Sequence, residues 1–271
     1  MVENFQFKDL YSVEDLIEIV RILRAPGGCP WDAEQSHESI RKDLIEETYE
    51  VIEAINKNSP EMLREELGDV LLQVVFHTVL EEEKNSFVFS DVTDEICKKL
   101  IVRHPHVFGD VNVSSTEEVL TNWDAIKMDT KKQTTVAEAI YSIPRELPAL
   151  MRAGKVQKKA AKVGFDWPDV NGAFEKIGEE ASEVKEAMEK GCQEALTDEI
   201  GDLLFAVVNV ARKSGVDPEE ALTKATDKFS RRFELTEKMA TEKGLDMKNT
   251  SLEKLDELWD EAKLILKNQM P

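Results

Sequence analysis

Residues 179–202 read EEASEVKEAMEKGCQEALTDEIGD, and the interpretation of the whole chain starts from this stretch. It places Glu180 three residues before Glu183, and Glu199 three residues before Asp202. Residues at this spacing share one face of a helix, with about 5–6 Å between their Cβ atoms. Each pair therefore predicts a two-carboxylate clamp, provided that both segments are helical.

The apolar residues around these acids predict two helices. Two apolar stripes at three-to-four spacing are present: Phe174, Ile177, Ala181, Val184 and Met188 form the first, and Leu196, Ile200, Leu203, Leu204 and Val207 form the second. Gly191 lies between them and suits the left-handed position that ends a helix. Because the connection is short, we expect an antiparallel pair that brings all four carboxylates to one side of its seam.

Four carboxylates so close together repel one another. Like charges at helical spacing cost about 0.2–0.5 kcal/mol per pair, and a bound cation removes this cost. Four hard oxygen ligands without Cys or His suit Mg²⁺, with Mn²⁺ as an alternative, and do not suit zinc. A solvated acidic face is the simpler explanation for one such stretch taken alone.

The arrangement occurs a second time, which argues against a solvated face. The same four acidic positions recur 133 residues earlier, as Glu47, Glu50, Glu66 and Asp69. Asn58 stands at the position of Gly191, and Gly68 at that of Gly201. Because a glycine inside a helix costs about 1 kcal/mol relative to alanine, we expect something to approach the backbone closely at both glycines.

The internal repeat covers roughly residues 29–127 and 165–263. It predicts an N-terminal domain, residues 1–128, and a C-terminal domain, residues 151–271, which we expect to be the main catalytic unit. Residues 129–150 have no counterpart in the repeat and are interpreted as a linker. We expect tandem duplicated all-α domains, each contributing to a four-helix-bundle-like core that dimerisation completes.

Basic and aromatic residues recur in the same order after both acidic segments. Arginine can bind phosphate oxygens bidentately, and a tryptophan face can stack on a base. We therefore predict that these residues bind substrate, although surface ion pairs and core packing are the alternatives for each one alone. The candidates are Lys228, Arg231, Arg232, Trp259 and Lys176, with Lys99, Arg103 and Trp123 in the N-terminal half.

Composition excludes several classes of partner. The net charge of −20 argues against a nucleic-acid backbone as the partner. No run of about 18 apolar residues and no signal peptide are found, so we expect no membrane span. The three cysteines have no metal-binding spacing and fit a reduced, cytoplasmic setting.

Together these motifs resemble the MazG family of all-α nucleoside triphosphate pyrophosphohydrolases. The resemblance rests on the two acidic patterns and covers nearly the whole chain. Further segments that carry it are 28–32 (GCPWD), 44–50 (LIEETYE), 103–108 (RHPHVF) and 163–167 (VGFDW).

The resemblance implies hydrolysis of ribo- and deoxyribonucleoside triphosphates to monophosphate and pyrophosphate, with Mg²⁺ and broad base tolerance. It implies that the C-terminal acids hold the metal and that Lys228, Arg232 and Trp259 contact the nucleotide. It also implies a homodimer. We expect water activated by the metal to attack the α-phosphorus, with Glu179 or Glu180 accepting the proton. The N-terminal site is either active or serves assembly or regulation.

The chain departs from the family at one position. Related enzymes can carry a phosphate-contacting lysine just before the second acidic helix, where this chain has Ala195. Two alternative functions stay open, namely a nucleotide-sensing or partner-binding protein without turnover, and a hydrolase directed at an alarmone resembling guanosine tetraphosphate. Base preference is also open, because a stacking tryptophan accepts any base.

Overall fold

The computed structural model describes residues 5–113, 115, 118–119 and 135–269, and these residues form helices and no strand. The expected all-α class is confirmed. The chain divides into two compact units, Met1–Lys127 and Met128–Pro271. Each unit is described by itself below.

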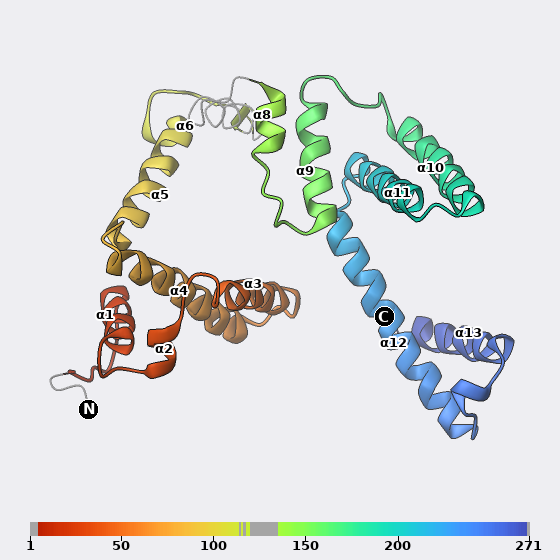
Figure 1. The fold of residues 1–271 in the computed structure, drawn as a ribbon, viewed down its shortest axis with the longest axis horizontal. Coiled ribbons are helices and arrows are strands. Elements are labelled where there is room, and N and C mark those ends of the chain that lie inside the picture. The colour runs from red at the N-terminus through yellow and green to blue at the C-terminus, as the bar shows by residue number, and fades with distance from the viewer. Residues whose placement is uncertain (1–4, 114, 116–117, 120–134, 270–271) are drawn as a thin grey trace. The chain divides into compact units, whose positions relative to one another are not determined.

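The described helices of the first unit surround the long helix α4 (Figure 1). They are α1 (Val13–Arg24), α2 (Pro30–Glu34), α3 (Arg41–Asn56), α4 (Pro60–Glu83), α5 (Phe89–Arg103) and α6 (Pro105–Phe108). The α4 helix contacts α1, α3 and α5, so it carries the core of this unit.

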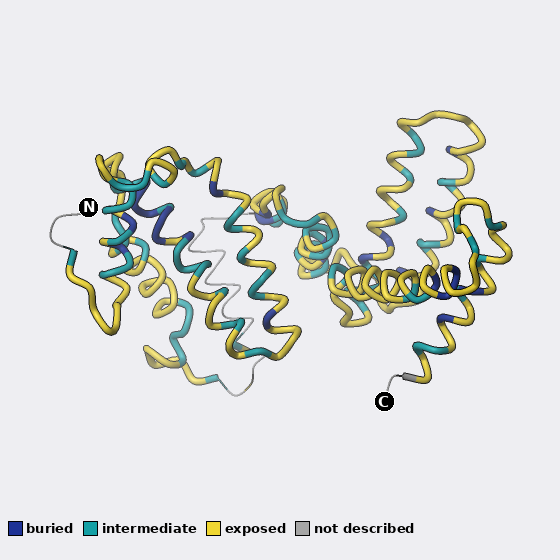
Figure 2. The backbone as a smooth tube through the Cα atoms, turned by 90° about the horizontal axis from the view of Figure 1, so that it is seen from below, coloured by how far each residue is buried: buried dark blue, intermediate teal, exposed yellow. Residues whose placement is uncertain are grey.

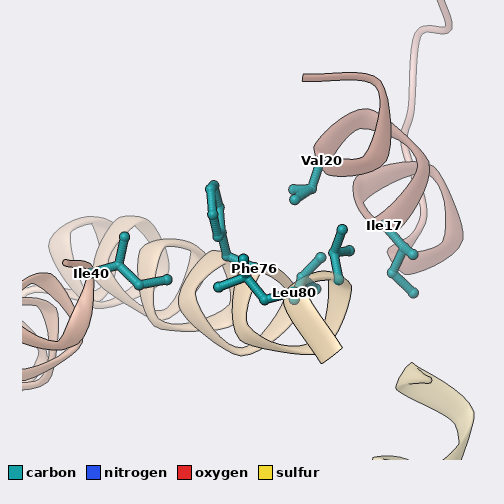
Figure 3. Packing of buried hydrophobic residues seen from close by; sticks show 7 residues of the cluster. Ile17, Val20, Ile40, Phe76 and Leu80 are labelled. Carbon is teal, nitrogen blue, oxygen red and sulfur yellow. The ribbon is translucent and has the colours of Figure 1, made fainter. Parts of the chain in front are cut away.

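The core of the first unit lies where α1 meets the C-terminal half of α4. Ile17 and Val20 of α1 pack with Phe76 and Leu80 of α4, and Ile40 closes the cluster just before α3 (Figure 3). All five side chains are buried. Burying one such side chain stabilises the fold by about 1.5–3 kcal/mol. This cluster therefore anchors α4, on which two of the candidate metal ligands lie.

A short turn joins α3 to α4. Asn58 has a φ of 50°, in the left-handed region that the sequence predicts there. The Ser59 hydroxyl then accepts a hydrogen bond from the Met62 backbone N–H, and Pro60 occupies the first helical position. The chain reverses its direction here, so α3 and α4 form an antiparallel hairpin.

The second unit contains the corresponding hairpin and, among its described residues, four further α-helices and a 3₁₀ turn (Figure 1). Its described elements are α8 (Val136–Tyr141), α9 (Ala149–Ala161), α10 (Val170–Lys190), α11 (Gln193–Lys213), α12 (Pro218–Glu242), the 3₁₀ turn η1 (Met247–Asn249) and α13 (Leu252–Gln269). Helix α8 lies within residues 129–150, the segment without a counterpart in the repeat, and it packs against α9.

The α10–α11 hairpin has clear start and stop signals. The Asp169 carboxylate accepts hydrogen bonds from the backbone N–H groups of Asn171 and Gly172 at the start of α10. Gly191 ends the helix with a φ of 66°, as predicted. Helix α11 begins two residues later, so the two helices pack side by side along their length.

The seam between α10 and α11 differs from the seam that the apolar stripes suggest. The fully buried positions of α10 are Ala173, Glu180 and Ala187, two small residues and one acid. Small side chains let the helices approach closely, and the larger apolar residues are displaced to the flanks. Leu204 on α11 is half exposed for this reason.

Both hairpins leave apolar side chains uncovered in the single chain. Figure 2 shows that most of the paired helices are exposed or only partly buried. The exposed apolar residues are Ile45, Tyr49, Ile52 and Ile55 on α3, Leu67 on α4, Phe174 and Met188 on α10, and Ile200, Leu204 and Val207 on α11. Contiguous apolar faces of this kind mark surfaces that bind another molecule.

Helices α12 and α13 form a second cluster in the C-terminal unit. Met239 and Ala240 of α12 pack against Leu258 and Ala262 of α13. The N-terminal part of α12 lies near α9, whereas α13 packs on its far end, away from α10 and α11 (Figure 1). Among the described helices, none is long and apolar enough to cross a membrane.

Candidate functional site

Three acids of the C-terminal hairpin meet across its seam. One carboxylate oxygen from each of Glu180, Glu199 and Asp202 lies within 4.8 Å of the other two. Glu180 belongs to α10 and the other two to α11, so the antiparallel packing predicted from the sequence brings them together. Only 4% of Glu180 is exposed, whereas Asp202 reaches the surface.

Lys176 lies one turn before Glu180 and is bound to it. Its Nζ lies 2.5 Å from Glu180 Oε1 and 2.8 Å from Glu179 Oε1. These hydrogen bonds raise the pKa of Lys176, so the ammonium stays charged. The other oxygen, Glu180 Oε2, is buried and has no hydrogen-bond partner in the described chain. An unpartnered buried carboxylate oxygen is costly unless a ligand completes its environment.

Glu183, the fourth predicted acid, lies at the edge of this group. Its partial burial raises the pKa of Glu183, and the negative charges of Glu180 and Glu199 raise it further. Lys176 acts in the opposite direction and lowers it. The four acids therefore share one electrostatic environment, as the sequence predicts, although only three of them form the closest group.

The N-terminal hairpin builds the same arrangement. Oxygens of Glu47 on α3 and of Glu66 and Asp69 on α4 lie within 4.8 Å of one another. Burial raises the pKa of Glu47 and of Glu66, and the neighbouring acids add to both shifts, with Glu50 contributing to each. Four acids therefore converge here too.

One residue beside the acids differs between the two hairpins. At the spacing of 133 residues that relates the acids, the counterpart of Lys176 is Asp43. The N-terminal hairpin therefore has an acid one turn before Glu47, where the C-terminal hairpin has its cation one turn before Glu180. The constant spacing of the repeat makes this difference between Lys176 and Asp43 visible in the sequence alone.

The chemistry of the donors tests whether a metal fits these sites. Within the described residues, both groups contain carboxylates and neither contains Cys or His. Burial, and after it the neighbouring negative charges, raise the pKa of Glu183, of Glu47 and of Glu66, and a divalent cation would offset both effects. Oxygen donors of this kind fit a hard divalent cation. Glu180 Oε2, which is buried and has no hydrogen-bond partner among the described residues, is an oxygen that could bind such a cation at the C-terminal site.

The predicted base-binding tryptophan is covered by its own chain. The Arg232 guanidinium lies over the Trp259 ring, 4.9 Å from its centroid, and the Phe229 ring packs 5.0 Å from it. Stacking of this kind is worth about 0.5–2 kcal/mol. Lys228 and Arg231 extend from the same helix and are exposed. These residues therefore form a basic and aromatic group on α12 and α13.

The N-terminal counterparts are only partly described. Lys99 is exposed on α5, and Arg103 is half-buried at its end. The Nε atoms of Arg103 and Arg232 are both buried and both lack a hydrogen-bond partner among the described residues. Trp123 lies outside the described residues.

The acids and the basic group stand on different helices of the second unit. The acids lie on the α10–α11 hairpin, while the basic group lies on α12 and on α13, whose Trp259 packs against Phe229 and Arg232 of α12.

Two antiparallel hairpins that each gather acidic carboxylates define an all-α protein with two candidate sites for a divalent cation. The family model of the MazG nucleotide pyrophosphohydrolase domain matches residues 35–108 and 172–236, which include both hairpins. The chain therefore belongs to the MazG family, in agreement with the resemblance of its motifs.

Individual relatives are similar over almost the whole chain. The nucleoside triphosphate pyrophosphohydrolase/pyrophosphatase MazG of Thermotoga maritima is 46% identical over 250 residues, which cover 92% of this chain and 95% of that protein. The nucleoside triphosphate pyrophosphohydrolase of Escherichia coli K12 is 44% identical over 255 residues, covering 93% and 97%. The uncharacterized protein YabN of Bacillus subtilis is 49% identical over 246 residues, covering 90% of this chain and 50% of that protein.

Proposed function

We propose that this protein hydrolyses nucleoside triphosphates, with ribose or deoxyribose and any base, to the monophosphate and pyrophosphate with the help of Mg²⁺. The enzyme class follows from membership of the MazG nucleotide pyrophosphohydrolase family and from the two relatives named for this activity. The observation that carries the metal dependence is the group of Glu180, Glu199 and Asp202 around an unpartnered buried oxygen.

The C-terminal acids hold the metal in this proposal, and Mn²⁺ can replace Mg²⁺. Glu180, Glu183, Glu199 and Asp202 are the ligands. When bound, the cation lowers the pKa of a water molecule and offsets negative charge on the phosphates. Glu179 is exposed and close to the cluster, so it or Glu180 accepts the proton from the attacking water. Lys176 keeps Glu180 in place through their 2.5 Å ion pair.

The basic group on α12 and α13 binds the nucleotide. Lys228 and Arg231 are exposed and can reach phosphate oxygens, with Arg232 beside them. Trp259 offers a ring for the base once Arg232 turns toward a phosphate, because the two now lie in contact. Stacking on a ring does not select a base, which supports broad base tolerance.

A homodimer supplies what the single chain lacks. The apolar faces of α10 and α11 are exposed in one chain, and a second copy would cover them in a shared four-helix core. The same contact would bring the basic group of one chain toward the acids of its partner. The cytoplasmic setting belongs to the same proposal and is supported by three cysteines without disulfide bonds.

The N-terminal group is proposed as a second metal site, built from Glu47, Glu50, Glu66 and Asp69. Lys99, Arg103 and Trp123 are its candidate substrate contacts. Asp43 adds negative charge where the C-terminal site has a lysine. This difference supports a C-terminal site that carries the main activity.

Product analysis tests the proposal. Wild type, Glu180→Gln and Glu47→Gln are incubated with Mg²⁺ and a panel of ribo- and deoxyribonucleoside triphosphates, together with a guanosine tetraphosphate. Glu186→Gln, an exposed acid on α10 outside the cluster, is the matched control. We expect monophosphate and pyrophosphate from the triphosphates. Glu180→Gln should lower kcat by about 100-fold or more, because losing a direct metal ligand exceeds the 10–100-fold effect of losing a supporting contact.

Each other outcome has a definite meaning. Release of orthophosphate would exclude pyrophosphohydrolysis, and nucleotide binding without turnover would favour a sensor. Preferential cleavage of the tetraphosphate would favour an alarmone-directed hydrolase. Equal partial losses in Glu180→Gln and Glu47→Gln would show that both sites work.

The oligomeric state is tested by light scattering. Wild type should have about twice the 30.7 kDa mass of one chain. Leu204→Glu should lower that mass by placing a charge in the shared core, whereas Lys185→Glu, outside the apolar face, should not. A wild-type mass equal to one chain would refute the homodimer.

A further inference from the structure

The C-terminal unit contains a cavity that the acidic site does not use. It measures about 580 Å³, within the range of small-molecule sites in proteins. Its wall is formed by α8, α9, the loop before α10, and the second half of α11. The side chains that matter below are Gln157, Phe165, Trp167, Phe205, Asn209 and Arg212.

The cavity begins close to the acids along α11 without including them. Phe205 lies three residues after Asp202, and Asn209 and Arg212 continue the same face of the helix. At a rise of about 1.5 Å per residue, the cavity extends along roughly 5–15 Å of helix beyond Asp202. A nucleotide has comparable dimensions.

Three aromatic side chains line the cavity. Phe205 forms one side, and Phe165 and Trp167 come from the loop that precedes α10. Phe165 is 83% exposed, although a phenylalanine normally gains free energy by burial. Aromatic rings that line a hollow favour a flat ligand, which can stack on their faces.

Gln157 gives the cavity an unused acceptor. Its Nε2 donates a hydrogen bond of 2.7 Å to the Phe205 carbonyl, which fixes the orientation of the amide. Its Oε1 is therefore turned away from that carbonyl, and it is buried without a partner in the described chain. Only 6% of the Gln157 residue is exposed. An N–H group on a ligand would satisfy this oxygen.

The charged residues at the cavity are already neutralised. Arg212 binds Asp166 through two nitrogens, at 2.5 and 3.2 Å, and also donates to Asn209 Oδ1. Lys213 adds a further bond to Asp166. Because Asn209 Oδ1 accepts from Arg212, its Nδ2 is the atom of this amide that can donate to a ligand. The cavity therefore suits an uncharged ring with both N–H donors and ring-nitrogen or carbonyl acceptors.

We infer that this cavity binds a nucleobase, as part of a nucleoside or nucleotide. The base stacks on Phe165 or Trp167 and donates an N–H to Gln157 Oε1. Every common base combines a flat ring with donors and acceptors on its edge. The inference does not depend on hydrolysis, because a chain that binds nucleotide without turnover would use the cavity in the same way.

Calorimetry with nucleosides tests this inference. Adenosine, guanosine, cytidine and uridine are titrated into the full chain in EDTA, so that neither phosphates nor metal contribute. Phe165→Ala removes a ring that is mostly exposed, so it should fold. Gln157→Leu removes the amide and keeps the approximate shape. Phe7→Ala, an equally exposed ring in the first unit, is the matched control. Trp259→Leu removes the other candidate base contact.

We expect at least one nucleoside to bind wild type, and both cavity variants to weaken its affinity by about tenfold, the range of one lost stacking or hydrogen-bond contact. Phe7→Ala should leave it unchanged. The inference is overturned if no nucleoside binds at millimolar concentration, or if only Trp259→Leu reduces binding. These outcomes differ from failure of the proposed function, which is the absence of pyrophosphate release with Mg²⁺.

Steady-state kinetics then show whether the bound base belongs to the substrate or to a separate effector. If the base belongs to the substrate, Phe165→Ala raises KM for the triphosphate by the same factor as it weakens the nucleoside. If the cavity is a separate effector site, that KM stays constant and the nucleoside does not compete with substrate. Both results support a nucleobase cavity.

Discussion

The two acidic hairpins have the same framework and different electrostatics. In each, an acid on the first helix meets two acids on the second, within 4.8 Å. Asn58 and Gly191 end the first helices in the same left-handed conformation. Yet Glu180 is buried and paired with Lys176, whereas Glu47 is only half-buried and has Asp43 at the lysine position. Shared ligand geometry therefore does not imply shared activity.

The physical reason for the difference is the charge beside the ligands. A carboxylate removed from water needs a compensating partner, and Lys176 provides one for Glu180. Lys176 also acts to lower the pKa of Glu183, although burial and the other acids have the larger effect and raise it. The pKa values of Glu47 and Glu66 are instead raised by burial and by their acidic neighbours.

The largest expected effect on activity comes from replacing Lys176 by the residue that stands at its position in the N-terminal hairpin. Lys176→Asp gives the C-terminal site the charge pattern of the N-terminal one. It should lower kcat/KM for triphosphates by about 100-fold, since it leaves Glu180 buried without its cation and adds repulsion. The measurement is the initial rate of pyrophosphate release. Lys185→Asp, on the same helix outside the cluster, should retain activity. Full activity in Lys176→Asp would remove the explanation of the difference between the hairpins.

Metal binding provides a second comparison. Added Mg²⁺ should raise the thermal midpoint, because a ligand at 100 times its Kd stabilises the folded state by about 2.7 kcal/mol. Glu180→Gln and Glu47→Gln should each remove part of this rise in the thermal midpoint. Scanning calorimetry with and without Mg²⁺ measures the rise. Glu186→Gln should respond as wild type does. A full response in Glu47→Gln would show that the N-terminal acids hold no metal.

The paired glycines compare the two backbones directly. No atom near Gly68 or Gly201, apart from its own helix, lies within 4 Å of where a Cβ would stand. Alanine should therefore stabilise each helix by up to about 1 kcal/mol, measured by urea unfolding. We expect Gly201→Ala alone to lower activity, because the space there is reserved for substrate or a second chain. Undiminished activity would mean that nothing approaches this backbone during turnover.

The smallest effect concerns a cluster that only the N-terminal hairpin has. His37 Nδ1 lies 2.8 Å from His77 Nδ1, and His37 Nε2 lies 2.6 Å from Glu81. At the same spacing, Val170, Val210 and Ser214 stand in the C-terminal unit. Burial lowers the pKa of His77 from 6.5, and the His37 charge lowers it further. Since the unfolded chain takes up this proton first, stability should fall as pH drops below about 6.5.

Hydrogen exchange of α4 between pH 8 and pH 5.5 measures this loss. His77→Gln should flatten the dependence, and His106→Gln, a histidine outside the cluster, should leave it as in wild type. Lys84 and His37 lower the pKa of Glu81 to about 2, so its stabilising effect is lost only as pH falls from about 4.5 toward 2. If the stability of α4 falls with pH in His77→Gln as it does in wild type, this histidine does not cause the pH dependence.

The sequence predicted much of the fold and of the acidic sites because the signals are local. Spacing of three residues on a helix places Glu199 and Asp202 on one face whatever the rest of the chain does. A glycine at position 191 and an asparagine at 58 mark helix ends through their own backbone preferences. The apolar stripes were a weaker guide, because residues at the same spacing can face a neighbouring helix, a second chain or solvent.

By itself, the sequence determined the all-α class, the two acidic hairpins and the MazG family. These follow from periodicity and from a repeat at constant spacing. Only the tertiary structure decided that Glu180 lies in a seam of small residues, that Arg232 covers Trp259, and that Gln157 meets Phe205 beside a cavity. Such contacts join residues far apart in the chain, and they depend on how whole helices pack, which no local pattern encodes.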